Sequence, residues 1–515
     1  MRKSGSCGVD RSLEEAWKKV LFNQFHDILP GSGIREVYID AAETHQQAAE
    51  IGTHELQGSL QTIAGHINTS KMRGVLPVVI FNPLSWDRTD IAKIKLPKGD
   101  ETIYAVFDEA GKEIPSQTIQ TGRYDREVLF IAQTIPSMGY KTYQLKKQKP
   151  SASATGLTVS AEKLENQFFS VALDTKTGWL RNITDKRNGK EVLSGQGNEF
   201  QLLADYPKAW DAWNVGLTGV QYPSTLRKAE IVENGPVRVV VRLYRDYLKP
   251  GEKKDFPTED FPSSFFTQDI ILYNGIDRID FSNSVDWWED KTFLKVAFPV
   301  SVSDTVATYE IPYGTIQRST QLRNSWEKAK VEVPARSWAD LSDGSFGVSL
   351  INNSKYGYDI KGNIIRLSLL RSPKWPDPTA DRGKHVIEYA LYPHKGTWRD
   401  AHTVQRGYEF NYPLISVLTD VHKGDLPLQQ SFVRLTPSNL VLTGLKKAED
   451  GDAWIVQWYD AEGEASTAAV TFPRAPKKVE RSNFIEASGI DIPAEKNTVR
   501  VPTNKSSVVT IKVSF

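Results

Sequence analysis

The hydrophobic period of the chain changes near Val75 from helix-like to strand-like and does not change back. Beyond this point apolar and polar residues alternate in short runs, such as IAKIKL at 91–96, VRVVVRLYRDYL at 237–248 and SVVTIKVSF at 507–515. Gly, Pro, Asp and Asn separate the runs, and no helical stripe of any length comes between them. Consecutive strands without crossover helices indicate antiparallel sheets packed face to face. We therefore predict a mainly β fold of several antiparallel β-sandwiches, the central one large, preceded by a short N-terminal helical bundle.

Changes in composition divide the predicted sheets into domains. The stretch KKQKPSASATG, residues 146–156, is polar and rich in small residues, which is typical of a linker. We expect a helical segment over 1–72, a small β-sandwich over 73–150, a large β-sandwich over 151–425 and a C-terminal sheet domain over 426–515. The length supports this division, because a chain of 515 residues is long enough for about three or four domains.

Two helices are expected before the sheets. Ser12 and Glu15 have the spacing of a capping box, so the first helix is expected to begin just after Ser12. An apolar stripe with helical spacing follows, and its members are Trp17, Val20, Leu21, Phe25 and Ile28. Pro30 and Gly31 should end this helix. A second and looser helical pattern covers residues 35–67.

Charge and cysteine content exclude several classes of partner. With 64 basic and 63 acidic residues, the net charge is close to zero, so the chain has no overall positive potential that would bind nucleic acid or an anionic membrane. A neutral ligand is therefore expected. Cys7 is the single cysteine, which rules out an intramolecular disulfide. The opening segment lacks the apolar core of a secretory signal, and no run of about eighteen apolar residues occurs. We expect a soluble protein of the cytoplasm or periplasm, and homo-oligomer formation is left open.

His26 and Asp27 are the first candidates for a functional site. They are expected in the last turn of the first helix, where a side chain can lean outward from the helix end. An imidazole there can be a metal ligand. It can equally be a surface group that complements the helix dipole, or a hydrogen-bonded core residue. Spacing alone does not choose between these interpretations.

Longer segments carry a family resemblance. NQFHDILPGSGI (23–34), with EEAWKKVLF before it and VYIDA after it, resembles the segment of glycoside hydrolase family 38 α-mannosidases that closes the catalytic domain and enters its helical bundle. VVIFNPLSWDRTD (78–90), the run from 164 to 193 and DRGKHVIEYALYPHKG (381–396) resemble the C-terminal half of bacterial members. The resemblance covers nearly the whole chain from about Ser12 onward.

The resemblance implies roles for two residues and a reaction for the family. His26 matches one of the zinc ligands, and Asp27 matches a residue that contacts the sugar at the zinc site. The family enzymes are retaining: one carboxylate attacks the anomeric carbon, and a second carboxyl group donates and then removes a proton. A mannose-containing glycan is the implied substrate, and zinc is the implied cofactor of the complete enzyme.

The same resemblance implies that a catalytic part is missing. In the family, the nucleophile and an H-x-D pair of zinc ligands precede the helix that carries NQFHD. None of the eight histidines of this chain is followed two positions later by Asp. A catalytic zinc needs about three protein ligands. We expect a C-terminal portion that contains no catalytic residue, does not stably bind zinc alone and is inactive without an N-terminal catalytic half.

Two tryptophan-bearing loops, at 205–213 and 372–383, are candidates for the rim of the site. Loops of the large β domain reach that rim in the family, so Arg371, Asp377 and Arg382 are candidate substrate-binding residues. Tryptophans in these loops could stack on sugar rings, although core packing is the default expectation for most of the 13 tryptophans. The alternative to an enzyme half is a non-catalytic carbohydrate-binding or structural β-sandwich fragment. In either case, the helix face that would meet a missing domain should be apolar and exposed.

Overall fold

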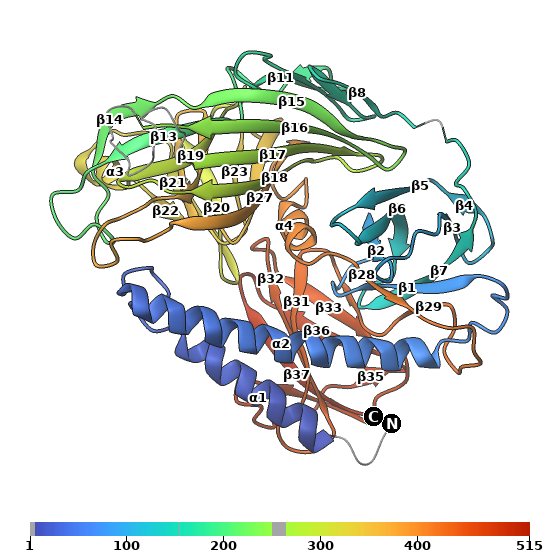
Figure 1. The fold of residues 1–515 in the computed structure, drawn as a ribbon. Coiled ribbons are helices and arrows are strands. Elements are labelled where there is room, and N and C mark those ends of the chain that lie inside the picture. Colours follow the sequence, from blue (N-terminus) through green and yellow to red (C-terminus); the bar gives the residue numbers. More distant parts are fainter. Residues whose placement is uncertain (1–5, 154, 250–263) are drawn as a thin grey trace.

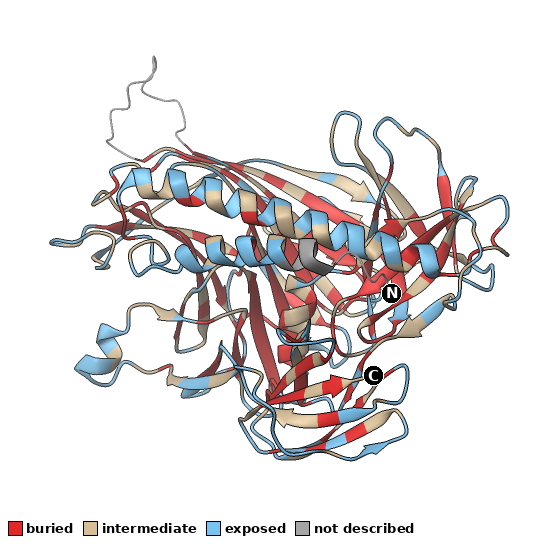
Figure 2. Ribbon diagram, turned by 90° about the horizontal axis from the view of Figure 1, so that it is seen from below, coloured by how far each residue is buried: buried red, intermediate tan, exposed pale blue. Residues whose placement is uncertain are grey.

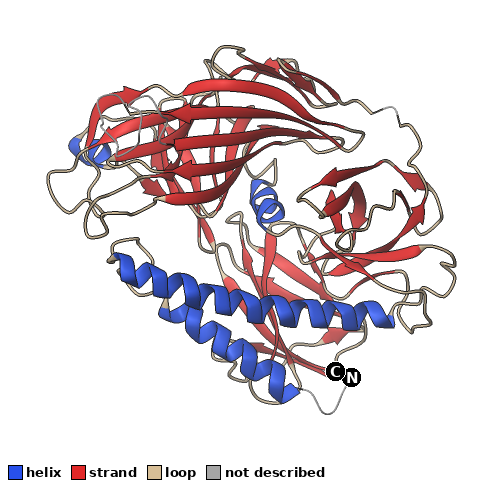
Figure 3. Ribbon diagram, viewed as in Figure 1, coloured by secondary structure: helices blue, strands red, loops and turns tan. Residues whose placement is uncertain are grey.

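The computed structural model describes residues 6–153, 155–249 and 264–515, with the side chains of the first helix from Arg11 onward. The side chain of Cys7 and residue 154 of the predicted linker lie outside the described residues. Strands dominate this part of the chain, and helices form only a hairpin and two short pieces within it (Figure 3). Neighbouring strands run antiparallel, as in the register of β16 (Arg238–Tyr247) with β17 (Ser264–Tyr273). The predicted mainly β fold of antiparallel sandwiches is confirmed.

The helical hairpin consists of α1 (Ser6–Phe22) and α2 (Arg35–His66), which run antiparallel along one side of the molecule (Figure 1). The prediction that the first helix begins after Ser12 is wrong. Ser12 lies inside α1, and its hydroxyl donates a hydrogen bond to Glu55 Oε1 of α2 over 2.7 Å. Ser12 therefore contacts the second helix and does not cap the first. In the described part of the chain, no helix has the length and apolar character needed to cross a bilayer.

The end of α1 also differs from the prediction. The helix stops at Phe22, and the next residue, Asn23, is buried. The Asn23 side-chain amide donates to Thr44 Oγ1 over 2.8 Å and to the Ala41 carbonyl oxygen over 3.4 Å, which ties this point to α2. His26 and Asp27 consequently lie in the turn after the helix. The second helix matches its predicted range, and within the described residues the predicted bundle is a hairpin of two helices.

The small β-sandwich packs two sheets around a core that includes Val78, Ile94, Phe130 and Tyr143. One sheet has the order β28-β1-β7-β3-β4, with β29 also paired to β7. Its strands are β28 (Ile415–Leu418), β1 (Leu76–Asn82), β7 (Gly139–Lys147), β3 (Tyr104–Phe107), β4 (Glu113–Ile114) and β29 (Gln429–Ser431). The other sheet contains β2 (Arg88–Lys95), β6 (Arg126–Ile135) and β5 (Ser116–Gln120).

The large β-sandwich shares one core, which includes Phe200, Phe281, Trp287 and Tyr389. Its longest sheet in the described residues adds to β16 and β17 the strands β15 (Thr225–Asn234), β18 (Ile279–Trp287), β27 (Gly383–Lys395), β24 (Phe346–Asn353), β23 (Trp338–Ser342), β20 (Val306–Ile311) and β21 (Gly314–Ser319). The facing sheet contains β14 (Leu217–Tyr222), β13 (Glu199–Asp205), β19 (Thr292–Pro299), β26 (Ile364–Leu370), β25 (Gly357–Lys361) and β22 (Val333–Pro334).

A third sheet and a short helix complete this region. The sheet contains β12 (Lys190–Glu191), β11 (Leu180–Asp185), β10 (Phe169–Leu173), β9 (Lys163–Glu165) and β8 (Thr158–Ser160). The helix α3 (Ser325–Ala329) begins after Asn324, whose side chain accepts a hydrogen bond from the Glu327 backbone N–H. This is the usual N-cap arrangement, in which a side-chain oxygen pairs a free backbone N–H of the first turn.

The C-terminal sandwich packs two further sheets around a core that includes Val456, Trp458 and Ile511. One sheet contains β30 (Arg434–Thr436), β33 (Ser466–Thr471), β36 (Thr498–Thr503) and β35 (Ala494–Glu495). The other contains β31 (Leu440–Lys447), β32 (Trp454–Asp460), β37 (Val508–Ser514) and β34 (Lys478–Ser482). The helix α4 (Thr403–Asn411) joins this sandwich to the large one, since Val404 packs with Trp338 and Val441.

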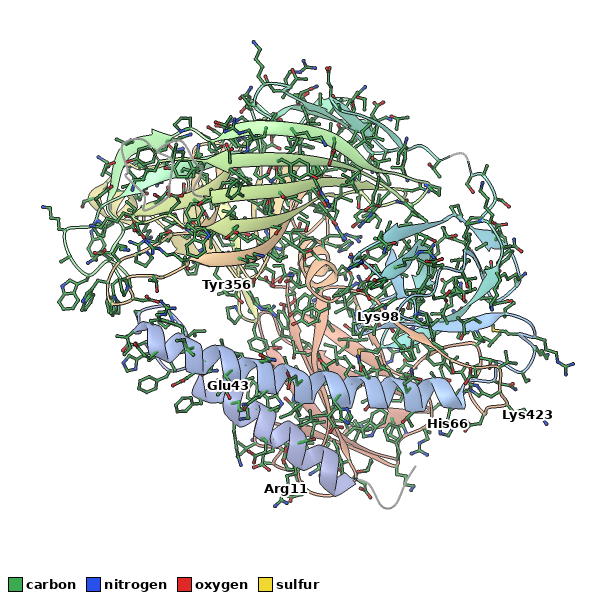
Figure 4. All side chains as sticks on the ribbon, in the orientation of Figure 1. Arg11, Glu43, His66, Lys98, Tyr356 and Lys423 are labelled. Carbon is green, nitrogen blue, oxygen red and sulfur yellow. The ribbon has the colours of Figure 1, made fainter. Side chains whose placement is uncertain are left out.

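The segment after α4 crosses the expected domain ranges. Strand β28 lies within 151–425, the range expected for the large sandwich, yet it pairs with β1 of the small sandwich, with Phe81 opposite Ile415. The end of α2 packs against the same sheet, and His66 lies beside the loop that carries Lys423 (Figure 4). There the His66 ring nitrogen Nδ1 lies 2.9 Å from Asp425 Oδ1. These contacts fix the hairpin to the sheets at one end, so its turn extends toward the large sandwich at the other end.

Candidate functional site

The turn between the two helices presents His26 at the surface. The His26 side chain is 76% exposed, and its Nε2 lies 3.3 Å from Oδ2 of Asp27, which is 46% exposed. The Phe25 ring packs on the imidazole with a centroid distance of 4.4 Å. The ring is thus open to solvent on most of its surface, and it does not belong to a packed core. Because α1 ends at Phe22, complementing the helix dipole in the last turn does not explain its position either.

Tyr38 of α2 holds the turn in shape. Its hydroxyl donates to the Asp27 carbonyl oxygen over 3.0 Å and accepts a hydrogen bond from the Gly33 N–H over 2.6 Å. A Cβ at Gly33 would lie 3.3 Å from both the Asp27 carbonyl oxygen and the Tyr38 hydroxyl, which leaves little room for a side chain there. The Ser32 hydroxyl donates to Asp27 Oδ1 over 3.0 Å. Backbone and carboxylate of Asp27 are therefore both positioned before any ligand arrives.

A loop of the large sandwich meets this turn. Arg35 Nη1 donates a hydrogen bond to Thr379 Oγ1 over 3.2 Å. Burial raises the pKa of the Tyr38 hydroxyl, and the negative charges of Asp27, Asp377 and Asp381 raise it further. Carboxylates of the turn and of the loop are therefore both close enough to Tyr38 to affect its ionisation. In Figure 1 the turn between α1 and α2 lies at the end of the large sandwich. The structure thus brings together His26, Asp27 and the loop that contains the predicted rim residues.

The buried Asp377 is engaged within its own loop. Its Oδ1 accepts hydrogen bonds from the Thr379 N–H over 2.7 Å and from the Thr379 hydroxyl over 2.9 Å. Thr379 therefore links Asp377 to Arg35, a role that sequence reasoning missed. No sequence signal could have identified it, because Thr379 is an ordinary loop threonine and its partner is 344 positions away.

The two predicted arginines also have partners within the protein. Arg371 Nε donates to Asp205 Oδ2 over 2.8 Å, and its Nη1 donates to the Ala212 carbonyl oxygen over 3.3 Å. Arg382 Nη2 lies 2.7 Å from Asp290 Oδ2, and Lys374 Nζ lies 3.0 Å from Asp290 Oδ1. Burial opposes the ionisation of Asp290, but Lys374 and Arg382 outweigh this effect and lower its pKa. Substrate contacts by Arg371, Asp377 and Arg382 stay predictions.

Three tryptophans of the two rim loops lie in mutual contact. The Trp210 ring is 4.8 Å from that of Trp375 and 6.0 Å from that of Trp213, and the Trp213 and Trp375 rings are 5.4 Å apart, centroid to centroid. Their residues are 59%, 46% and 50% exposed in the order Trp210, Trp375 and Trp213. Core packing, the default expected for most tryptophans, holds for Trp287 and Trp338, which are fully buried, but not for these three.

The implied zinc can be tested against the donors at the turn. A catalytic zinc centre takes about three protein ligands and an open position. His26 and Asp27 offer one imidazole and one carboxylate, and no group of three or more His, Cys, Asp or Glu residues able to hold a metal occurs in the described part of the chain. These side chains do not fit a complete zinc centre by themselves.

Profiles of three protein families match this chain. "Alpha mannosidase middle domain" matches residues 5–63, which include the whole helical hairpin except its end. "Glycosyl hydrolases family 38 C-terminal domain" matches residues 164–379, and "Glycosyl hydrolases family 38 C-terminal beta sandwich domain" matches residues 439–512. The turn, both tryptophan-bearing loops and the C-terminal sandwich therefore fall largely within matched ranges.

Curated relatives extend the match to most of the chain. "Alpha-mannosidase G" of Dictyostelium discoideum is 29% identical over 93% of this chain and 45% of its own length. "Alpha-mannosidase 2C1" of Homo sapiens is 32% identical over 88% of this chain and 40% of its own length. The chain thus spans less than half the length of these relatives. The crystal structure of an α-mannosidase from Enterococcus faecalis V583 shares the fold, with a TM-score of 0.83 and 16% identity over 98% of this chain and 63% of that one.

Proposed function

Because this chain belongs to glycoside hydrolase family 38, we propose that it forms the C-terminal portion of a zinc-dependent, retaining α-mannosidase that hydrolyses terminal α-mannosides of glycans. The observation that carries this proposal is the exposed imidazole of His26 beside the Asp27 carboxylate, on a turn held in place by Tyr38. A non-catalytic binding or structural fragment is the less favoured alternative. Such a fragment would have no use for a preorganised and solvent-exposed imidazole–carboxylate pair.

The proposal divides the active site between two parts of a longer protein. His26 supplies one zinc ligand, and Asp27 contacts the sugar held at that zinc. The nucleophilic carboxylate and the remaining zinc ligands come from an N-terminal catalytic half, in keeping with the greater length of the relatives. When bound, the metal would orient the sugar hydroxyls and polarise them. We assign no nucleophilic or proton-transfer step to the described residues of this chain.

An exposed apolar surface on the hairpin supports this division. Leu13, Trp17 and Leu21 follow one another at four-residue spacing and so lie on one side of α1. Figure 2 shows that much of the outward side of both helices is exposed. We use the term hairpin face for the exposed apolar residues of α1, the turn and the start of α2, which are Leu13, Trp17, Leu21, Phe22, Phe25, Leu29, Ile34 and Ile39.

The N-terminal half is the proposed occupant of the hairpin face. Burying one large apolar side chain is worth about 1.5 to 3 kcal/mol, so a partner that covered several of these side chains would gain substantial binding energy. The face continues to Phe25, which packs on the His26 ring. A domain that docked here would reach the imidazole directly.

The test compares the isolated chain with its assembly with the N-terminal half. We expect the isolated chain to show no turnover of an aryl α-mannoside and no stoichiometric zinc, and the assembly to show both. In the assembly, His26→Ala should abolish turnover and lower the zinc content with little change in the melting temperature, because the exposed ring contributes little packing. His54→Ala, which alters an exposed histidine of α2, is the matched control. Turnover by the isolated chain, or an active His26→Ala assembly, would overturn the proposal.

A further inference from the structure

Trp210, Trp213 and Trp375, which we call the tryptophan platform, form an exposed aromatic cluster on two loops of the large sandwich. We propose that this platform binds pyranose rings of the glycan on the leaving-group side of the mannosidic bond. The inference rests on the proposed function and adds a substrate-binding surface to it. The ligand class is a neutral oligosaccharide, whose sugar rings present C–H faces that stack on indole.

The position of the platform relates it to the candidate site. Trp375 and Thr379 belong to the same loop, and Thr379 is hydrogen-bonded to Arg35 at the start of α2. Four residues of extended chain span at most about 14 Å, so Trp375 lies within that distance of the contact with the hairpin, measured between backbone atoms of the loop. A glycan whose terminal mannose reached His26 and Asp27 would therefore have its next sugars near the platform.

Hydrogen bonds to the backbone of its two loops hold the platform in place. The Ala212 N–H donates to the Trp375 carbonyl oxygen over 3.1 Å, which joins the two loops. The Arg371 guanidinium then clamps the first loop, because it donates to the carbonyl oxygens of Ala212 and Asn214 while it pairs with the buried Asp205. Rings fixed in this way lose little conformational freedom when a ligand binds, which is how preorganisation improves affinity. Arg371 is thus a positioning residue for the platform.

The backbone at Trp210 is also unusual. Its φ of 60° lies in the left-handed region, which a bulky residue rarely adopts. The conformation is energetically unfavourable and persists only where the surroundings enforce it, and such sites cluster at ligand-binding positions. Here the Trp213 N–H donates to the Trp210 carbonyl oxygen over 2.9 Å, so a backbone hydrogen bond joins the residues that carry two of the exposed indoles.

The ring geometry and the surrounding charges favour a sugar. The Trp210 ring stands at 75° to that of Trp375 and at 85° to that of Trp213, so the rings present faces in different directions. Exposed Lys208 and Asn214 and the half-buried Asp211 flank the rings and offer hydrogen-bonding groups of both kinds without a dominant charge. Such a surface suits hydroxyl-bearing rings better than a strongly charged ligand.

The test uses the assembly of this chain with its N-terminal half and two substrates. An aryl α-mannoside reports the reaction without leaving-group sugars, and a linear α-mannose oligosaccharide adds them. We expect Trp375→Ala to lower the ratio of kcat/KM for the oligosaccharide to kcat/KM for the aryl mannoside about three- to tenfold, the effect of losing one aromatic contact. Trp375→Tyr should restore most of the ratio. Trp326→Ala, at a residue of α3 that is 82% exposed, is the control and should leave the ratio unchanged.

A second measurement separates this inference from the proposed function. Isothermal titration of the isolated chain with the same oligosaccharide should show weak binding that Trp213→Ala removes and Trp326→Ala does not, whether or not the assembly is active. Melting temperatures of the variants check that they fold. The inference would be overturned if Trp375→Ala left the substrate ratio unchanged or if the isolated chain did not bind the oligosaccharide. It would also be overturned if the N-terminal half protected the platform from hydrogen exchange, because a protein surface would then cover the platform.

Discussion

Arg35, the first residue of α2, donates a hydrogen bond to the hydroxyl of Thr379 in a loop of the large sandwich. This contact joins the turn that carries His26 and Asp27 to the loop that carries Asp377 and Trp375. Two parts of the sequence that are 344 positions apart thus form one surface. The hydrogen bond also holds Thr379 where it can donate to Asp377, so the arrangement depends on residues from both elements.

The first prediction measures this link in the isolated chain. Arg35→Ala and Thr379→Val each remove one partner, and a double-mutant cycle should give a coupling of about 0.5 to 1 kcal/mol in the free energy of unfolding, the usual worth of a hydrogen bond near the surface. Urea denaturation measures the four proteins of the cycle. Arg35→Ala combined with Thr62→Val, whose hydroxyl bonds the Gly58 carbonyl oxygen of its own helix, should show no coupling. Strict additivity at Arg35 and Thr379 would contradict the expected link.

Local patterns predicted the strands well because burial follows side-chain alternation. In the run from Asp90 to Leu96, the two lysines are exposed and their neighbours are buried, as a strand with one solvated face requires. The helical spacing of apolar residues over 35–67 likewise predicted the second helix. The start of α1 was predicted wrongly. Ser12 and Glu15 have the spacing of a local cap, but the Ser12 hydroxyl donates a hydrogen bond to Glu55, which is 43 positions away.

The domain ranges and the site could be predicted only in part, because both depend on contacts between residues that are far apart in the sequence. Nothing in residues 415–418 shows that β28 leaves the large sandwich to pair with β1, because either sheet would accept its alternation. His26 and Asp27 could be selected as candidates from the sequence through resemblance, but their exposure could not, since it depends on where α1 ends. The exposure of the tryptophan platform likewise depends on Arg371 and on contacts between two loops.

The second prediction concerns acid stability of the large sandwich. Lys295 is buried and ion-paired with Asp359 and Glu332, and Arg366 Nε donates to Asp359 Oδ1 over 2.8 Å. Burial opposes ionisation of Asp359, but the charges of Lys295 and Arg366 outweigh it, so its pKa lies below the ordinary value of about 3.9. A folded-state pKa below the unfolded one gives stability that is present above about pH 4 and is lost as the pH falls through the folded-state pKa.

Asp359→Asn tests this account. The variant should lose about 3 kcal/mol of unfolding free energy at pH 7, because it leaves the buried Lys295 with one carboxylate fewer, and it should lose less additional stability than the wild type below pH 4. Guanidinium denaturation between pH 3 and pH 7 provides the comparison. Asp450→Asn, at an exposed position, should stay within about 0.5 kcal/mol of wild type. Parallel pH profiles for the wild type and Asp359→Asn would show that another group dominates acid unfolding.

The third prediction concerns the hairpin face. Because its exposed leucines and aromatic rings have no cover in the described part of the isolated chain, we expect self-association at micromolar concentration, measured by sedimentation velocity. The double substitution Leu21→Lys and Phe22→Lys places two charges at the end of α1, on two of these exposed residues, and should return the chain to a monomer. The same substitutions should prevent assembly with the N-terminal half, since burying an unpaired ammonium group costs far more than an apolar contact gains. Ile103→Lys charges an exposed residue of the small sandwich, outside the helical hairpin, and should alter neither property. If the double variant still self-associates, the self-associating surface lies elsewhere. If it still assembles with the N-terminal half, the hairpin face is not part of the interface that we propose.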